Sequence, residues 1–511
     1  MDQIVIVGGG TAGWMAAIAL SAQFPEKQIT VIDPAEIRPI GVGESVTGVV
    51  LQFVLNPAHG LDLAEFFAHA DATLKLGIWF KDWTAPGTEY LSPLDVPNRM
   101  FQHKYFQDSE DFYALMTAQG LSSGEEQIHG KLMRANRTDY VREPDGRISS
   151  KLSSASCHFD SLKFAAWLKS KAQTRPNITH VDDVLSRFSQ DAETGLVTEV
   201  VTKKGQHIGG DFFLDCTGLR RMLFQPAYQP QWIDYSRYIK VDSAMPTFAA
   251  HAEGERMPVY TAARAMRHGW MWQIPTQSRL GNGYVYSSQY ASDEQVIAEQ
   301  QELGIDVGEN PRILRFQPGK FATQMQGNVC AIGLSGGFIE PLEATTIHIM
   351  FVQIRILAEL LLPYYSPQAS DALSQKYNTL IATMYNDFVD FVSFHYRTGR
   401  MDSDFWRDYQ RDDSHSPANN ARLETWRHAF PSREDFASSP TNRVLLTTGL
   451  IVWMPMLSGL GLLSGEAARK LLASSRFGQH AQANMARYMQ VRDFLLANGV
   501  PQEEVLGECF G

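Results

Sequence analysis

The chain contains few cysteines, and they are widely separated. The four cysteines, Cys157, Cys216, Cys330 and Cys509, show no C-x-x-C or C-x-x-H spacing among the 511 residues. Such spacing is typical of a zinc or redox site, so we expect neither a metal centre nor a disulfide framework. The cysteine pattern instead favours a reducing compartment, the cytoplasm.

Long basic runs are also absent, and the chain carries a formal net charge of −11. A nucleic-acid-binding protein usually presents clustered Lys and Arg side chains, so we expect no nucleic-acid partner. The first residues enter an apolar, strand-like pattern without a preceding basic segment, so we expect no signal peptide.

One apolar stretch, residues 444–463, is long enough to be a membrane-spanning helix. It is interrupted by Gly449, Pro455, Gly459 and Gly461. These breakers favour a buried helix–turn segment, so we expect no membrane insertion. The composition, 44% hydrophobic and 20% charged, is typical of a globular protein with two or three packed lobes.

The N-terminal residues combine a strand, a glycine-rich turn and a helix former. Residues 3–7 are apolar and β-branched, and a G-x-G-x-x-G pattern follows them: Gly8, Gly9, Gly10, Thr11, Ala12 and Gly13. A second strand, residues 28–32, ends at Asp33, twenty residues after Gly13. The glycines allow a pyrophosphate to approach the backbone, and the acid can hold a ribose hydroxyl. We therefore predict a dinucleotide-binding lobe.

The continuation of the chain favours FAD over a nicotinamide cofactor. A regular βαβ alternation does not follow, and Gly41-Val42-Gly43-Glu44 and a long insertion come instead. Strands expected at 198–203, 210–214 and 329–334 fit the same lobe, and the second of them ends at Asp215. We predict a discontinuous FAD-binding domain (1–90, 155–225 and 320–362), substrate-side insertions (91–154 and 226–319) and a helical C-terminal region (363–511).

A lysine interrupts an apolar, strand-like run at residues 72–80. Lys75 could lie on an edge strand and face water. If it is buried between Leu74 and Leu76 instead, burial would lower the pKa of its ammonium group and make it a reactive group or a strong hydrogen-bond donor.

A second candidate site lies in residues 331–350. A Gly336-Gly337 turn precedes Pro341 and an apolar segment, 347–362, with helical spacing. Free amides at such a helix start can bind an anion. Glu343 lies at this junction, either as an acidic first-turn residue of a buried helix or as a functional group.

Two tryptophans alternate in the segment Gly269-Trp270-Met271-Trp272-Gln273-Ile274-Pro275. In a strand, Trp270 and Trp272 would share one face. A packed core strand explains this pattern, and the same indoles could also separate a flavin from a bulky organic substrate.

Together these motifs resemble those of the flavin-dependent halogenases, in order from residue 2 to about residue 360. The shared segments are the G-x-G-x-x-G of Gly8–Gly13, the G-V-G-E of Gly41–Glu44, the K-L-G-I of Lys75–Ile78, the W-x-W-x-I-P of Trp270–Pro275 and the E-P-L-E of Glu340–Glu343. The E-P-L-E form resembles the tryptophan and indole branch of the family.

The resemblance implies an α/β fold: a Rossmann-like FAD lobe of the aromatic hydroxylase type, an inserted β-rich region and a helical C-terminal lobe. Lys75 would hold or activate hypohalous acid, Glu343 would assist halogen transfer or take the ring proton, and Trp270 and Trp272 would separate flavin from substrate. The residues expected at FAD are Gly8, Gly10, Thr11, Ala12, Gly13, Asp33, Gly41, Val42, Gly43, Val184, Asp215, Leu334 and Ile347.

Thr345 and Thr346 occupy the halide positions of the family, where this chain departs from the usual pattern. The family usually reads E-S-T-G or E-S-T-S, whereas this chain reads Glu343-Ala344-Thr345-Thr346. The change should reshape the halide site, so chloride and bromide both stay open.

The expected activity is FADH2- and O2-dependent halogenation of tryptophan or another indole-type arene. A separate flavin reductase would supply FADH2, the substrate would be a small aromatic, and the enzyme would be a monomer or homodimer. An FAD-dependent aromatic hydroxylase is the nearest alternative, and a non-catalytic flavin carrier is an alternative of another class.

Overall fold

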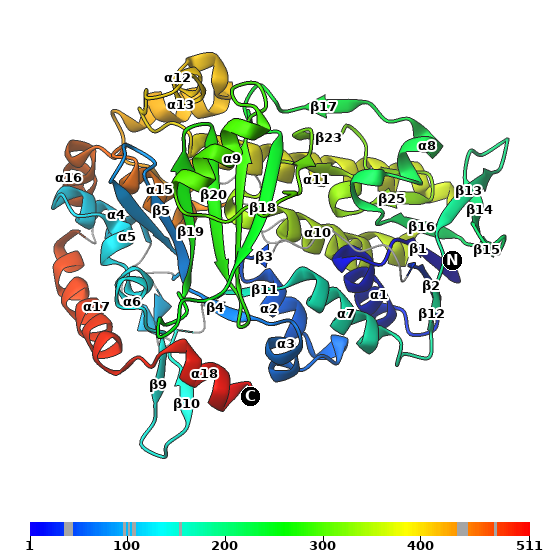
Figure 1. The fold of residues 1–511 in the computed structure, drawn as a ribbon, viewed down its shortest axis with the longest axis horizontal. Helices are drawn as coiled ribbons and strands as arrows, with labels where there is room; N and C mark the ends of the chain where they lie inside the picture. The colour runs from blue at the N-terminus through cyan, green and yellow to red at the C-terminus, as the bar shows by residue number, and fades with distance from the viewer. Residues whose placement is uncertain are drawn as a thin grey trace.

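The computed structural model describes residues 1–34, 44–95, 99–100, 103–104, 109–152, 156–436, 448–474 and 478–511. The expected flavin contacts Gly41, Val42 and Gly43 lie outside these residues. The elongated molecule has a parallel sheet near the N-terminus, a larger mixed sheet in the middle and a helical region at the opposite end (Figure 1).

The first sheet has six strands in the order β12-β2-β1-β16-β25-β24. Its bounds are β12 Ile178–Val181, β2 Gln28–Ile32, β1 Gln3–Val7, β16 Phe212–Asp215, β25 Val329–Ala331 and β24 Met325–Gln326. All neighbours pair in parallel except β24, which is antiparallel to β25. This arrangement is the α/β lobe predicted from the glycine motif.

Alternation along β1 explains how both faces of this sheet are covered. Ile4 and Ile6 pack with helix α1 (Thr11–Gln23) in the main core. Val5 and Val7 pack in a second cluster with the antiparallel strands β13 (Leu185–Gln190) and β14 (Val197–Thr202), to which β15 (His207–Gly209) is added. The strand expected at 198–203 therefore covers the parallel sheet instead of joining it.

The second sheet has seven strands in the order β22-β18-β21-β20-β19-β5-β6. Its bounds are β22 Leu314–Arg315, β18 Ser243–Ala249, β21 Leu280–Tyr286, β20 Gly269–Pro275, β19 Tyr260–Met266, β5 Gly77–Lys81 and β6 Glu89–Pro93. Only the β19–β5 pair is parallel. This sheet corresponds to the β-rich region expected beside the flavin lobe.

The run 72–80 forms two strands in two sheets, because the chain changes partners at Leu76. Strand β4 (Thr73–Lys75) is the edge of a three-stranded sheet with β11 (Ser156–Phe159) and β3 (Glu44–Ser45). The Leu76 amide donates to the Val259 carbonyl, and the Leu76 carbonyl accepts from Leu94. The free edge of β4 is covered by Gln502, whose Oε1 accepts from the Leu74 amide at 3.1 Å.

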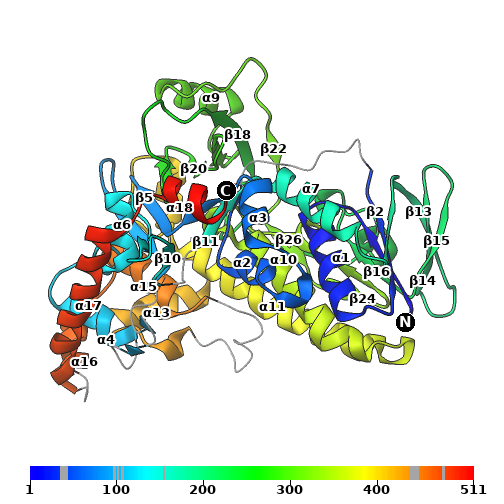
Figure 2. The same cartoon turned by 90° about the horizontal axis from the view of Figure 1, so that it is seen from below.

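The chain after residue 341 is mostly helical. After a turn at Leu342–Ala344 come α10 Thr345–Arg355, a π-helical turn Ile356–Leu361, α11 Ser370–Phe394, α12 Asp404–Tyr409, α13 Pro417–Trp426, α15 Leu450–Gly459, α16 Gly465–Ser474, α17 Gly478–Asn498 and α18 Gln502–Cys509. Figure 2 shows α11 running beside α10 along the parallel-sheet end of the molecule.

Helices from distant parts of the chain form the far lobe. α15, α16 and α17 pack against α4 (Ser109–Ala118), α5 (Ser123–Glu126) and α6 (Ile128–Ala135), as Figure 1 shows.

The sequence-based domain boundaries stay a prediction. The remaining elements are α2 Val49–Val54, α3 Leu63–His69, β7 Arg99–Met100, β8 His103–Lys104, β9 Tyr140–Arg142, β10 Ile148–Ser150, α7 Ser161–Ala172, α8 Phe224–Tyr228, β17 Trp232–Asp234, α9 Asp293–Glu302, β23 Gly319–Phe321 and β26 Gly337–Phe338.

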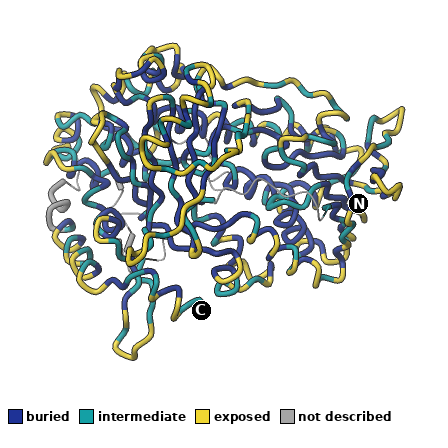
Figure 3. The backbone as a smooth tube through the Cα atoms, viewed as in Figure 1, coloured by how far each residue is buried: buried dark blue, intermediate teal, exposed yellow. Residues whose placement is uncertain are grey.

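The most apolar long helical stretch lies in the interior. Among the described residues, Leu342–Tyr364 is the one stretch long and apolar enough to span a membrane, and 78% of its apolar window is buried in the protein. In Figure 3 the buried residues are concentrated in the interior of the molecule. In the stretch that was considered from sequence, 444–463, the described part contains α15, a ten-residue helix with Pro455 inside it.

Gly13→Ala should destabilise the fold, because an added Cβ would lie 1.9 Å from the Gly8 carbonyl oxygen. We expect a loss of about 1–3 kcal/mol in the free energy of unfolding, the usual effect of overpacking. Urea denaturation can measure it, with Gly48→Ala as the control because nothing lies within 4 Å of a Cβ there. Equal midpoints for the two variants would contradict the prediction.

Candidate functional site

A cavity of about 300 Å³ opens at the carboxyl ends of the parallel strands. Ligands of open α/β sheets usually bind at this edge. Of the residues expected at FAD, those that line it are Gly8, Gly10, Thr11, Ala12, Asp33, Val184, Leu334 and Ile347. We call it the sheet-edge cavity.

The glycine motif brings backbone directly to this cavity. Gly8 has φ +104°, and a Cβ on it would lie 2.4 Å from the Cys216 carbonyl oxygen. A Cβ on Gly9 would lie 2.1 Å from Asp33 Cγ, whereas a Cβ on Gly10 would meet nothing within 4 Å. Gly10 caps α1 without a side-chain hydrogen bond, so the first amides of the helix are available to a phosphate. The residues present thus fit a dinucleotide.

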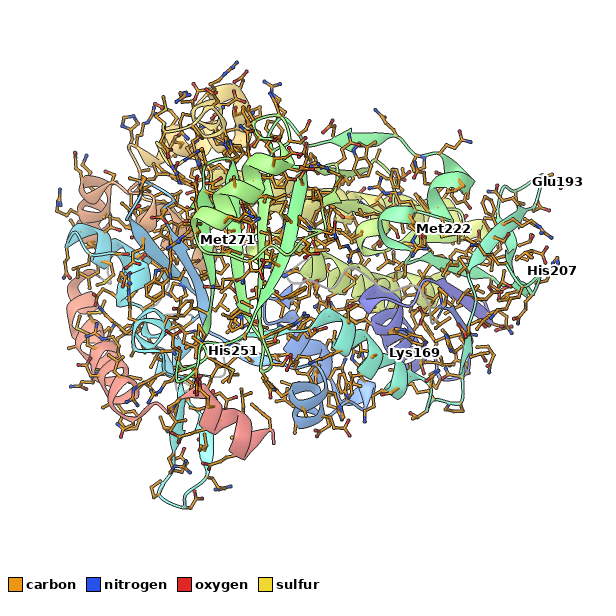
Figure 4. The ribbon with its side chains drawn as sticks, in the orientation of Figure 1. Lys169, Glu193, His207, Met222, His251 and Met271 are labelled. Atoms are coloured by element: carbon orange, nitrogen blue, oxygen red, sulfur yellow. The ribbon has the colours of Figure 1, made fainter. Side chains whose placement is uncertain are left out.

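Lys169 is a neighbour of Asp33 that the sequence did not indicate. Its Nζ lies 3.0 Å from Asp33 Oδ2. Figure 4 labels Lys169 on α7, whose sequence carries no cofactor motif. The residue is brought to Asp33 only by the packing of α7 against α1.

Asp215 and Gly13 lie behind the cavity wall. The buried Asp215 carboxylate accepts from the amides of Thr217, Leu223 and Phe224 at 2.8–3.0 Å. It therefore holds the loop of Cys216, Thr217 and Gly218, which does line the cavity. Gly13 packs beneath the turn against Gly8.

A second cavity, of about 170 Å³, adjoins the first. The two share five lining residues, namely Glu44, Leu219, Leu334, Thr346 and Ile347. The second cavity is also lined by Trp270, Trp272 and Glu343. Burial, and secondarily the charge of Asp160, raise the pKa of Glu44 to about 7. We call this space the tryptophan-lined cavity.

The two tryptophans are fixed in position by buried contacts. Their rings lie 6.3 Å apart at 61°. Trp272 lies on the backbone of Gly283, where a Cβ would come within 2.0 Å of its ring. Trp270 Nε1 donates to Glu340 Oε2 at 2.8 Å, and the Tyr396 hydroxyl donates to both Glu340 oxygens at 2.9 and 3.0 Å. Burial raises the pKa of Glu340 to about 7, although these hydrogen bonds oppose the shift.

Lys75 is buried, and the interpretation of a lysine facing water is wrong. It lies on an edge strand, but only 1% of its surface is exposed. Its Nζ donates to the Val46 carbonyl at 3.2 Å. Burial lowers the pKa of its ammonium group to about 8, and the negative charge of nearby Glu343 works against that shift. Lys75 and Glu343 therefore interact electrostatically, although they are far apart in the sequence.

Glu343 projects from a left-handed turn immediately before α10. Its φ is +63° and that of Ala344 is +54°, two successive conformations that side chains rarely adopt. Its Oε1 lies 3.1 Å from His395 Nε2, and His395 Nδ1 lies 3.0 Å from the Phe391 carbonyl oxygen. His395 directly follows α11 and had no sequence signal.

The two threonines lie at the start of α10. Thr346 lines both cavities. Thr345 is buried, and its hydroxyl has no hydrogen-bond partner within the described residues. Ala344 caps the helix without a side-chain hydrogen bond. Free first-turn amides and an unpartnered hydroxyl form a donor set suited to a small anion.

The chain is similar to known proteins along most of its length. A family model described as tryptophan halogenase matches residues 3–458. Tryptophan 7-halogenase KtzQ of Kutzneria sp. (strain 744) is 32% identical over 420 residues, covering 79% of this chain and 78% of that protein. Tryptophan 6-halogenase SttH of Streptomyces toxytricini is 29% identical over 506 residues, covering 93% and 94%. The solved tryptophan halogenase of Shewanella frigidimarina NCIMB 400 superposes with a TM-score of 0.87 at 25% identity, covering 100% and 98%.

Glu340→Gln should change how stability depends on pH. Because the folded pKa of Glu340 is about 7 against an ordinary 4.5, the folded protein holds a proton there that the unfolded chain releases. Wild-type stability should therefore fall as pH rises through this window, and the variant lacks this loss. Between pH 4.5 and pH 7.5, the free energy of unfolding of the variant should rise by about 3 kcal/mol relative to that of wild type.

Urea denaturation across this pH range measures the difference. Glu359→Gln is a control for the same chemical change, since that side chain is 54% exposed. Parallel pH profiles for wild type and Glu340→Gln would contradict the prediction.

Proposed function

Because the chain belongs to the tryptophan halogenase family, we propose that the sheet-edge cavity binds FAD and that halogenation of an indole-type arene occurs beside Lys75 and Glu343. The members of this family are flavin-dependent enzymes, and this chain is one of them. The observation that carries the site proposal is the burial of Lys75 within electrostatic range of Glu343, next to the tryptophan-lined cavity.

The sheet-edge cavity supplies what FAD requires. The amides at the start of α1 would bind the pyrophosphate, and Asp33, held by Lys169, would bind a ribose hydroxyl. Leu334 and Ile347, which line both cavities, would contact the ring system. When bound and reduced, the flavin supplies with O2 the oxidising equivalents that convert halide into hypohalous acid. A separate reductase would provide the reduced form.

The start of α10 would hold the halide. Thr346 lines both cavities, and the unpartnered Thr345 hydroxyl adds a donor beside the free amides of the first turn. An anion there is also favoured by the helix dipole.

Lys75 and Glu343 would act on the oxidant and the arene. The Lys75 ammonium would donate a hydrogen bond to hypohalous acid and draw electron density from its halogen. The Glu343 carboxylate would then accept the proton that the substituted ring loses, and His395 Nε2 orients that carboxylate. Trp270 and Trp272 would exclude the arene from the flavin, so that the small oxidant moves to it.

Halide dependence separates this function from direct aromatic hydroxylation. Purified protein with FAD, a flavin reductase, O2 and an indole should yield halogenated product only when bromide or chloride is present. Mass spectrometry of the products measures this outcome. Hydroxylated product without halide would favour the hydroxylase, and an unchanged arene would favour a flavin carrier.

Lys75→Met should lower kcat for halogenation by roughly 10²-fold or more, because it removes the charge-bearing donor from a water-excluded site. FAD affinity should stay unchanged, since Lys75 does not line the sheet-edge cavity. Flavin fluorescence titration and product assays measure the two effects. Lys81→Met, on the next strand, is the control, and an active Lys75→Met enzyme would remove Lys75 from this role.

Glu343→Gln should slow turnover by about 10²-fold, because the amide cannot accept the ring proton. Proton removal should then limit the rate, so an indole deuterated at the reacting carbon should show a larger isotope effect than with wild type. Rates with labelled and unlabelled indole test this, and Glu359→Gln serves as control. An unchanged rate and isotope effect would assign Glu343 to structure.

A further inference from the structure

A row of buried polar side chains crosses the small sheet that carries Lys75. His158 of β11 lies directly opposite Ser45 of β3 on one side and Thr73 of β4 on the other. Directly opposite residues of antiparallel strands project to the same face, and so does Lys75, two residues after Thr73. Thr261 of β19 meets this row from the seven-stranded sheet, since its Oγ1 lies 2.7 Å from Ser45 Oγ and 2.9 Å from His158 Nε2. The row therefore links the two sheets beside the lysine.

The hydrogen bonds of this row run in one direction only. The Thr73 hydroxyl donates to the Pro275 carbonyl at 2.7 Å, so it must accept from His158 Nδ1, 3.0 Å away. Burial, and secondarily the charge of Lys75, hold the pKa of His158 well below its usual range, so the ring is neutral and carries one proton. With that proton on Nδ1, Nε2 is an acceptor. The imidazole therefore has a fixed tautomer.

The fixed tautomer decides what Ser45 offers to the tryptophan-lined cavity. Thr261 must donate to the bare Nε2 of His158, so Ser45 must in turn donate to Thr261 Oγ1. Ser45 and Thr261 both line the cavity, where 7% and 5% of their surfaces are exposed. Because the protons of both hydroxyls are committed within the row, only oxygen lone pairs remain for a ligand. Ser45 is thus a hydrogen-bond acceptor in a largely apolar wall.

Ser45 is also next to the contacts of Lys75. The residue after it, Val46, provides the carbonyl that accepts from Lys75 Nζ at 3.2 Å. Strand β3 packs against the turn Leu342–Ala344, which carries Glu343. In the proposed function the oxidant leaves the tryptophan-lined cavity for Lys75 and Glu343, and Ser45 lies on that route. The one proton of hypohalous acid is on its oxygen, and it requires an acceptor in a site that excludes water.

We propose that Ser45 binds the oxidant: its hydroxyl oxygen accepts the hydrogen bond of hypohalous acid and holds the intact molecule beside Lys75. The inference rests on the proposed function and adds to it the residue that keeps the oxidant inside the protein until the arene takes the halogen. No bond of the oxidant breaks at Ser45. His158 and Thr73 are positioning residues, since they act only by setting the direction of the Ser45 hydroxyl.

The partition of the oxidant between the arene and an external trap tests this role. The assay contains FAD, a flavin reductase, O2, bromide, indole and a large excess of monochlorodimedone, whose absorbance falls when escaping hypohalous acid halogenates it. Ser45→Ala should raise the ratio of halogenated trap to halogenated indole roughly 3- to 10-fold, the effect of one hydrogen bond. Ser21→Ala is the matched control. Ser21 is also buried and donates to Asn177 at 2.7 Å, but it lines neither cavity, so its ratio should equal that of wild type.

Thr73→Val tests the direction of the row from a distance, since Thr73 lines neither cavity. The variant removes the acceptor of His158 Nδ1, so the ring proton should move to Nε2 and the Ser45 proton should turn toward the cavity. Nitrogen-15 NMR of histidine-labelled protein without flavin measures the tautomer, and the His158 signal is identified by its loss in His158→Gln. Wild type should show Nδ1–H and the variant Nε2–H, and the trapped fraction of the variant should rise as in Ser45→Ala.

Three outcomes would overturn the assignment of Ser45. These are a wild-type ratio in Ser45→Ala, a proton on Nε2 of His158 in wild type, and a Thr73→Val variant whose tautomer changes while its ratio does not. Failure of the proposed function looks different, because wild type would then yield neither halogenated indole nor halogenated trap. Halogenated products at an unchanged ratio would leave halogenation standing and remove Ser45 alone.

Discussion

The enclosure of Lys75 is the constraint on which the rest of the site depends. An ammonium group excluded from water is strongly unfavourable unless neighbouring groups compensate for the lost solvation. Here the Val46 carbonyl and the charge of Glu343 provide that compensation. Val46 directly follows β3, Lys75 is the last residue of β4, and Glu343 lies in the turn before α10. The three parts must therefore keep their relative positions for the lysine to stay charged.

Helix α10 forms part of the wall of both cavities. Its first turn lines both of them through Thr346 and Ile347. Further along, Gln353 accepts from the Gly333 amide at 2.8 Å through Oε1, and its Nε2 donates to Gln324 at 2.8 Å. Gly333 belongs to the loop that lines the sheet-edge cavity. One buried helix thus fixes both the proposed halide position and a loop of the sheet-edge cavity, which keeps the two cavities in a constant relative position.

Sequence patterns identified the local features, and packing determined the distant ones. The strand–glycine–helix order of residues 3–23 specifies the sheet-edge cavity, because Gly8, Gly9 and Gly13 leave no room for a Cβ. Lys75, Glu343 and the two tryptophans were recognisable by motif. Lys169 on α7 and His395 and Tyr396 in the turn after α11 were not, since these segments carry no motif and approach the site only through tertiary contacts. The strand break at Leu76 was missed because an apolar run does not show a change of partner.

The covering of β4 by Gln502 ties the site to the order in which the chain is made. The acceptor of the Leu74 amide is Gln502, which lies 428 positions later in the chain. The Gln502 side chain also donates to the carbonyls of Met257 and Pro258 at 2.9 Å. During synthesis on the ribosome, the strand that carries Lys75 therefore keeps an open edge until α18 has emerged. The edge of β4 next to Lys75 is covered only when the C-terminal helix α18 packs against it, so a chain truncated before Gln502 would leave the Leu74 amide without this acceptor.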